Sequence, residues 1–68
     1  MTANEVLKAL KARGAVLVRQ KGSHARYKSA CGECATTVPM HKGDVPIGTL
    51  RAIQKDMEPC YGEGWLLG

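Results

Sequence analysis

The sequence predicts a small α+β fold with the element order helix, strand, strand, strand, helix. Apolar residues recur at helical spacing near both ends of the chain, and short β-branched runs between glycine turns occupy the middle. A three-stranded antiparallel sheet can bury one face under two helices and leave the other face in water. We therefore expect a single domain, residues 1–68, with both helices on one face of the sheet and an apolar tail over residues 60–68.

A capping box predicts where the first helix begins. Thr2 and Glu5 stand three residues apart, so each side chain can accept a hydrogen bond from the other residue's free backbone N–H. The apolar stripe of this helix follows at helical spacing: Ala3, Val6, Leu7 and Leu10. Gly14 is the residue type that commonly ends a helix, so we expect the helix to stop there.

Two strands joined by a two-residue turn are expected next. Residues 15–21 are rich in β-branched side chains and are too few for a helix. Gly22 and Ser23 form the connection, and glycine at the first central position suits a type II′ turn. The second strand is expected to run from His24 to about Ser29.

Alternation along this second strand separates a core face from an open face. Successive side chains of a strand point to opposite sides of the sheet. Ala25 and Tyr27 suit the core, whereas His24, Arg26 and Lys28 suit solvent. The sequence therefore predicts a histidine in line with two cations on the open face.

The second half of the chain predicts a further hairpin and the second helix. Residues 31–34 resemble a hairpin turn, and residues 35–40 form a third strand in which Pro39 indicates an edge position or the strand's end. Pro46 suits the first turn of the second helix, and Pro59 is expected to end it. The apolar side of that helix consists of Ile47, Leu50, Ile53 and Met57.

Positive charge is concentrated in the first half of the chain. Seven Lys and Arg residues and no acid lie between Glu5 and Glu33, whereas beyond Glu33 four acids outnumber three bases, and the formal net charge is +4. A one-sided basic stretch is typical of a surface that binds a polyanion, and we expect RNA. A surface that merely keeps the protein soluble is the alternative, and salt-sensitive RNA binding would separate the two.

Membrane and export signals are not evident in the sequence. No run approaches the roughly 18 apolar residues of a membrane span, and the first residues lack the apolar region of a signal peptide. We therefore expect a cytoplasmic protein with no membrane partner, in which the three cysteines are mostly reduced.

Two histidines, His24 and His41, are the candidate groups for acid–base chemistry. An imidazole titrates near neutral pH, so it can take a proton from a ribose 2′-OH or give one to a leaving oxygen. His24 can equally be a surface histidine after a turn, and Ser23 either orients it or simply forms the turn. His41 can be the partner acid or base, an RNA contact, or a loop residue that caps the second helix, which we slightly favour.

The cysteines form an incomplete metal motif. Cys31 and Cys34 have the C-x-x-C spacing of a zinc knuckle, but a structural zinc site needs four ligands. Cys60 and His41 are the only obvious candidates to complete it, and a strong zinc motif has two paired spacings, so we expect no metal. A disulfide between Cys31 and Cys34 is conceivable in geometry but disfavoured in a reducing compartment, which leaves free thiols as the expectation.

Three blocks of sequence together resemble the HicA toxin family over about residues 3–58. They are Arg19-Gln20-Lys21-Gly22-Ser23-His24, Val38-Pro39-Met40-His41-Lys42-Gly43 and Gly48-Thr49-Leu50-Arg51-Ala52-Ile53. The resemblance implies a double-stranded-RNA-binding-domain-like fold. It also implies an mRNA interferase of a type II toxin–antitoxin module, which uses no metal or other cofactor and is neutralised by a HicB-type antitoxin that covers the histidine face.

The family's Gly-Ser-His element assigns the catalytic role to His24, supported by the turn of Gly22 and Ser23. His41 is the possible second acid or base. The expected RNA-binding residues are Arg19, Lys21, Arg26, Lys28 and Lys42. A module that binds structured RNA without cutting it needs the same cations but not His24, and a protein that only binds other proteins needs neither.

Two features depart from the family pattern. Cys31 and Cys34 stand where a polar hairpin is expected. The tail from Tyr61 to Leu67 is more apolar than a solvated end requires, and it can dock on an antitoxin or a second copy. We expect it instead to pack on the chain's own core.

Overall fold

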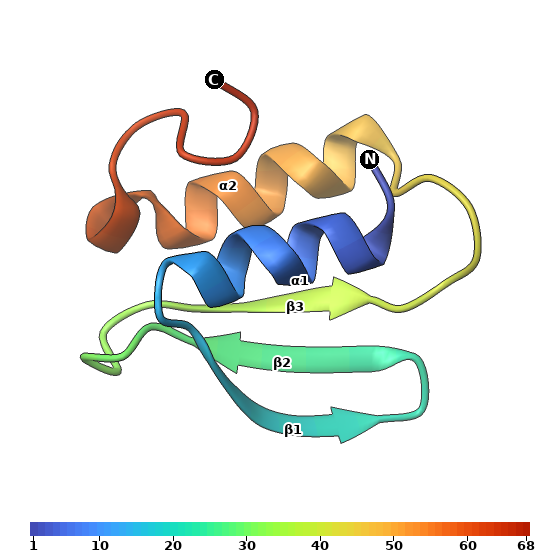
Figure 1. Cartoon of the computed structure of the whole chain (residues 1–68), viewed down its shortest axis with the longest axis horizontal. Helices are drawn as coiled ribbons and strands as arrows, with labels where there is room; N and C mark the ends of the chain where they lie inside the picture. The colour runs from blue at the N-terminus through green and yellow to red at the C-terminus, as the bar shows by residue number, and fades with distance from the viewer.

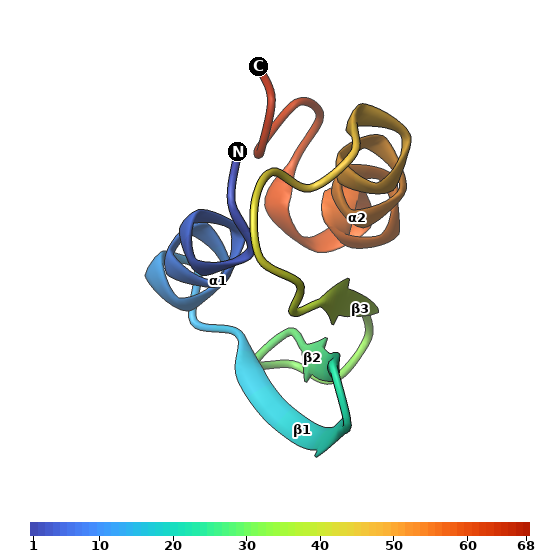
Figure 2. The same cartoon turned by 90° about the vertical axis from the view of Figure 1, so that its right-hand side faces the viewer.

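The structure is a computed structural model that describes residues 1–68. Its elements are α1 (Ala3–Ala12), β1 (Val16–Lys21), β2 (His24–Lys28), β3 (Ala35–Pro39) and α2 (Ile47–Tyr61). The strands form one antiparallel sheet in the order β1-β2-β3. Both helices lie toward β3, and β1 lies farthest from them (Figures 1 and 2). The predicted α-β-β-β-α order is confirmed.

Helix α1 begins at the predicted capping box. The backbone N–H of Glu5 donates to Thr2 Oγ1 at 3.2 Å, and the backbone N–H of Thr2 donates to Glu5 Oε1 at 2.9 Å. These bonds satisfy two of the donors that a helix start leaves free. Gly14, with a φ of 85°, takes the left-handed conformation that lets the chain leave the helix and enter β1.

The core lies between the helices and one face of β2 and β3. Along β2 the side chains alternate between exposed and buried, and Ala25 and Tyr27 are the buried ones, as the sequence predicts. Thr36 and Val38 of β3 face the same way. Val6, Leu10, Leu50, Ile53 and Met57 of the helices complete this core, and each is at most 4% exposed.

Strand β1 contributes little to this core. All six of its residues are exposed, including Val16, Leu17 and Val18, each about half exposed. The helices pack over β3 and do not extend to β1 (Figure 2). The prediction of two helices over one face is therefore correct for β2 and β3, while β1 is an edge strand that the helices leave uncovered.

The tail packs on the chain itself, as expected. Trp65 and Leu66 pack against the core, and Trp65 Nε1 donates a hydrogen bond to the carbonyl of Gln54 at 2.8 Å. The Trp65 ring also meets Tyr61 edge to face, with 5.1 Å between ring centroids. These contacts hold the residues after α2 against that helix.

Two sequence predictions about the C-terminal half are wrong. Pro59 does not end α2, which continues to Tyr61. A proline removes one backbone donor, but helical bonding continues beyond Pro59, since the N–H of Gly62 donates to the carbonyl of Glu58. The thiols are not all free either, because Cys34 and Cys60 form a disulfide between residues 26 positions apart, and only Cys31 remains free.

Neither helix is long and apolar enough to cross a membrane.

Candidate functional site

A bulge in β1 brings its cations onto the face that carries His24. Leu17 pairs with Tyr27, but the register then shifts so that Arg19 pairs with Arg26 and Lys21 with His24. Residues paired across antiparallel strands lie on the same face. Without the shift, Arg19 would pair with Ala25 and lie on the core face, since a slip of one residue reverses every side chain.

An open hollow of about 480 Å³ lies over this face. Its lining contains no apolar side chain and no acid. It consists of Arg19, Lys21, Gly22, His24, Arg26 and Thr37. Gly22 has a φ of 59°, the left-handed conformation that a glycine supplies readily at this turn position, so the predicted turn brings β2 back beside β1.

The charge of this hollow is not neutralised within the chain. The single salt bridge of the molecule joins the N-terminal ammonium to Asp44, and neither group lines the hollow. Arg19, Lys21 and Arg26 are exposed and have no carboxylate partner. A polyanion that binds here therefore meets cations that need not first break ion pairs.

His41 lies beside His24. The centroids of the two imidazole rings are 6.4 Å apart and the ring planes are nearly perpendicular, at 83°. The turn and the end of β3 are held together by a backbone bond from the N–H of Met40 to the carbonyl of Ser23. The two histidines are thus close enough to contact neighbouring atoms of one bound group.

The structure decides between alternatives for two further residues. His41 does not cap α2, because Pro46 occupies the N-cap position and no side chain bonds there. That prediction is wrong because the loop after β3 keeps His41 beside the first hairpin turn. Ser23 donates no side-chain hydrogen bond to His24 and serves as a turn residue whose carbonyl accepts from the N–H of Met40.

Arg26 is held by a residue that the sequence did not single out. Its Nη1 donates to Thr37 Oγ1 at 3.0 Å, and Thr37 is the cross-strand neighbour of Arg26 in β3. The alternation of β3, with Val38 facing the core, was the signal for placing Thr37 on the open face. Thr37 limits the freedom of the guanidinium at the floor of the hollow.

Two predicted RNA-binding cations lie outside the hollow. Lys28 is at the far end of β2, paired with Val16 and Ala35, although it is on the same face as His24. Lys42 lines a second hollow of about 330 Å³ with His41 and the start of α1. The structure thus brings together Arg19, Lys21, His24 and Arg26, with His41 next to them, and leaves Lys28 and Lys42 at the margins.

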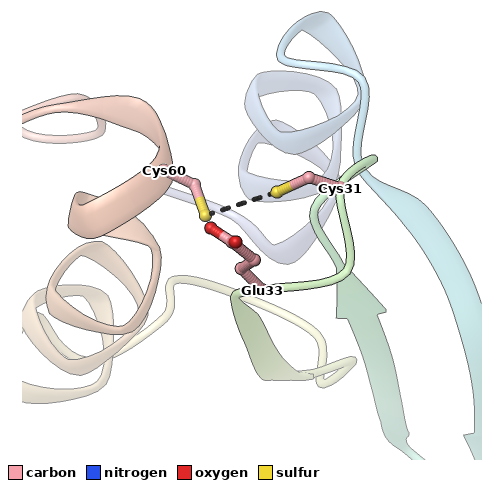
Figure 3. Close-up of side chains that lie close together, drawn as sticks. All are labelled: Cys31, Glu33 and Cys60. Atoms are coloured by element: carbon pink, nitrogen blue, oxygen red, sulfur yellow. Dashed lines mark hydrogen bonds between the residues drawn. The ribbon is translucent and has the colours of Figure 1, made fainter.

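A second cluster of reactive groups lies at the opposite end of the strands. Cys31, Glu33 and Cys60 bring one ligand atom each to within 4.8 Å of one another (Figure 3). The hydroxyl of Ser29 and then the backbone of Glu33 lower the pKa of the Cys31 thiol through hydrogen bonds. These groups are separated from His24 by the length of β2 (Figure 1).

Comparison with known families identifies this chain over most of its length. Residues 3–58 match the model of the HicA toxin of bacterial toxin–antitoxin systems. Comparison with curated proteins and with solved structures gives no match. The matched residues include both histidines, all three strands and most of α2. The chain belongs to the HicA toxin family.

Proposed function

We propose that this toxin is an mRNA interferase, an endoribonuclease that binds RNA and cleaves it by histidine acid–base chemistry without a metal ion. The observation that carries the proposal is the hollow that His24 lines together with Arg19, Lys21 and Arg26, and whose lining contains no acid. We place this activity in the cytoplasm, where mRNA is found.

The catalytic residue of this proposal is His24. RNA supplies its own nucleophile in the ribose 2′-OH, so cleavage requires removal of that proton, protonation of the leaving oxygen and stabilisation of the crowded phosphate. His24 is exposed at the mouth of the hollow and can exchange protons with a bound ribose. The cations Arg19, Lys21 and Arg26 stabilise the phosphate oxygens.

His41 is the second acid or base in this scheme. Its ring centroid lies 6.4 Å from that of His24, so both imidazoles can approach one phosphodiester that binds beside them. One histidine then removes the 2′ proton while the other protonates the leaving oxygen. If His41 only contacts the RNA, its loss will weaken binding and leave the chemical step unchanged.

The RNA-binding surface extends from the hollow along both margins. Arg19, Lys21 and Arg26 contact the phosphates at the cleavage point, with Gly22 and Ser23 shaping the turn above them. Lys28 continues the surface along β2, and Lys42 continues it past His41. Contacts of this kind position the RNA and make its binding sensitive to salt.

The partner in this proposal is a HicB-type antitoxin that covers the His24 face. Four exposed positive or titratable side chains around one hollow favour a partner that presents carboxylates there. Such a partner blocks both the cations and the histidine.

The experiment that tests the proposal follows cleavage of a structured RNA by the non-reduced chain in EDTA. We expect the chain to cut RNA but not its 2′-O-methyl counterpart, and His24→Ala to cut at least about 100-fold more slowly. Arg51→Ala, an exposed cation on α2, is the matched control and should cut normally. Equal cutting by His24→Ala, or a requirement for added metal, would contradict the proposal. Binding without any cutting would instead support a non-catalytic RNA-binding module.

A further inference from the structure

Two sulfur atoms of the loop between β2 and β3 and one of the last turn of α2 meet at the end of the sheet opposite His24. Cys31 Sγ lies 3.9 Å from Cys60 Sγ, and Cys60 is bonded to Cys34. The carboxylate of Glu33 points to the same place from the loop between β2 and β3 (Figure 3). The C-x-x-C spacing supplies two thiols, and the last turn of α2 supplies the third.

The separation of Cys31 and Cys60 matches that of two sulfurs on one metal ion. A tetrahedral zinc ion holds thiolates at about 2.3 Å, which places any two of them about 3.8 Å apart. Cys31 and Cys60 already have this separation, at 3.9 Å. Cys34 must move away from Cys60 to share an ion with it, because the two sulfurs are joined by a disulfide.

A buried hydroxyl at the centre of the cluster supports the sulfurs. Ser29 is 2% exposed, and its Oγ lies 3.2 Å from Cys31 Sγ and 3.6 Å from Cys60 Sγ. The same oxygen accepts a hydrogen bond from the backbone N–H of Cys34 at 3.1 Å. A hydroxyl in this place can donate to a metal-bound thiolate and fix its orientation.

We propose that the chain, once its Cys34–Cys60 disulfide is reduced, binds one Zn²⁺ through the thiolates of Cys31, Cys34 and Cys60 and the carboxylate of Glu33. A dithiol reductant supplies two electrons and two protons, and is itself oxidised to a disulfide. The three thiols then lose three protons to solvent as the ion binds. Three thiolates and one carboxylate complete the four ligands that the C-x-x-C pair alone lacks.

The ion and the disulfide would have the same structural effect. Each joins the loop between β2 and β3 to the last turn of α2, so the fold keeps a link there in both oxidising and reducing surroundings. The site goes beyond the proposed ribonuclease function and contains none of the residues assigned to it. Failure of the zinc site would therefore leave the assignment of His24 unchanged.

The test adds Zn²⁺ to the full chain, either oxidised or reduced with a phosphine, and measures the zinc that stays bound. After gel filtration, we expect the reduced chain to retain about one zinc per molecule by elemental analysis and the oxidised chain to retain none. Cobalt in place of zinc should give the intense near-ultraviolet absorption of thiolate ligands. If the reduced chain unfolds without metal, zinc should restore its far-ultraviolet circular dichroism.

Variants identify the ligands. Cys31→Ser keeps the disulfide pair intact but removes one thiolate, so we expect the reduced variant to bind zinc at least about tenfold more weakly. His41→Ala, at the opposite end of the strands, is the control and should bind like the unmodified chain. Zinc in the oxidised chain, no zinc in the reduced chain, or unchanged affinity in Cys31→Ser would each overturn the proposal.

Discussion

The two ends of the central strand differ in how their reactive side chains are held. At the β1–β2 turn, His24 and the neighbouring cations are exposed, and only Arg26 is tied, to Thr37. At the β2–β3 loop, Cys34 is bonded to Cys60 and Ser29 is buried among the sulfurs. The first end is open to a ligand, while the second links a loop to a helix. The exposed end at the β1–β2 turn can stay open to a ligand because the disulfide stabilises the fold at the other end.

The largest effect on stability should come from the linked end. Adding Cys34→Ser to a Cys31→Ser background removes the disulfide and leaves no second thiol for Cys60 to pair with. A link between residues 26 positions apart restricts the unfolded chain, so its loss should lower the free energy of unfolding by about 3 kcal/mol. Urea unfolding without reductant, in EDTA, measures this.

The open end should show the opposite pattern. His24→Ala removes an exposed side chain without a hydrogen bond, so its free energy of unfolding should change by less than about 0.5 kcal/mol. A large loss of stability in His24→Ala, or none in the double cysteine variant, would contradict the contrast between the two ends.

The RNA affinities of cation variants show which residues of the open end bind RNA most strongly. Arg26→Ala should weaken RNA binding about tenfold, because a guanidinium held toward the hollow by Thr37 loses charged hydrogen bonds to phosphate. Lys28→Ala should have a smaller effect, since Lys28 lies outside the hollow. Titrations at several salt concentrations should also show that the slope of log affinity against log salt concentration is smaller in magnitude by about 0.7–0.9 for Arg26→Ala.

Arg51→Ala removes a guanidinium from α2 and is the control for these titrations. Its affinity and salt slope should equal those of the unmodified chain. If Arg26→Ala and Lys28→Ala both bind as tightly as that control at low salt, the open face is not where RNA binds.

A smaller effect on stability than that of the disulfide is expected from the capping box of α1, where Thr2 lines the second hollow together with His41. Thr2→Ala should lower the free energy of unfolding by about 1 kcal/mol, because it leaves a helix-start donor unsatisfied. The backbone N–H and then the hydroxyl of Thr2 lower the pKa of Glu5 below its usual 4.5. The resulting stability is present above pH 4.5 and is lost as the pH falls through the lowered pKa.

Unfolding curves measured at several pH values test whether stability falls with pH in this way. The unmodified chain should lose more stability than Glu5→Gln between neutral pH and about pH 3, since the variant has no carboxylate to protonate. A Glu5→Gln chain with the same acid sensitivity would show that the capping box does not contribute to it.

The open end was predictable because it depends on short-range patterns. Alternation along β2 was enough to place His24 and Arg26 on one face with Ala25 and Tyr27 on the other. The bulge after Leu17 was not predictable, because the sequence has no glycine there to indicate it. Thr37 was missed for a related reason, since its role depends on which residue of β2 it pairs with.

The linked end was not predictable from local patterns. Cys31 and Cys34 were visible as a pair, but the partner of Cys34 is in another element, and α2 had been expected to end one residue before Cys60. The continuation of α2 through Pro59 is what places Cys60 over the loop. Such pairings depend on how helices pack on the sheet, which spacing along the chain does not specify.

In the proposed function His24 carries out the chemical step while the neighbouring cations hold the RNA. The most direct test measures binding and single-turnover cleavage of one RNA by the unmodified chain, His24→Ala and Arg26→Ala. We expect His24→Ala to bind within about twofold of normal and to cleave at least about 100-fold more slowly, and Arg26→Ala at saturating RNA to retain most of the cleavage rate. Cleavage by His24→Ala at the normal rate, with the RNA bound, would show that His24 is not the catalytic residue.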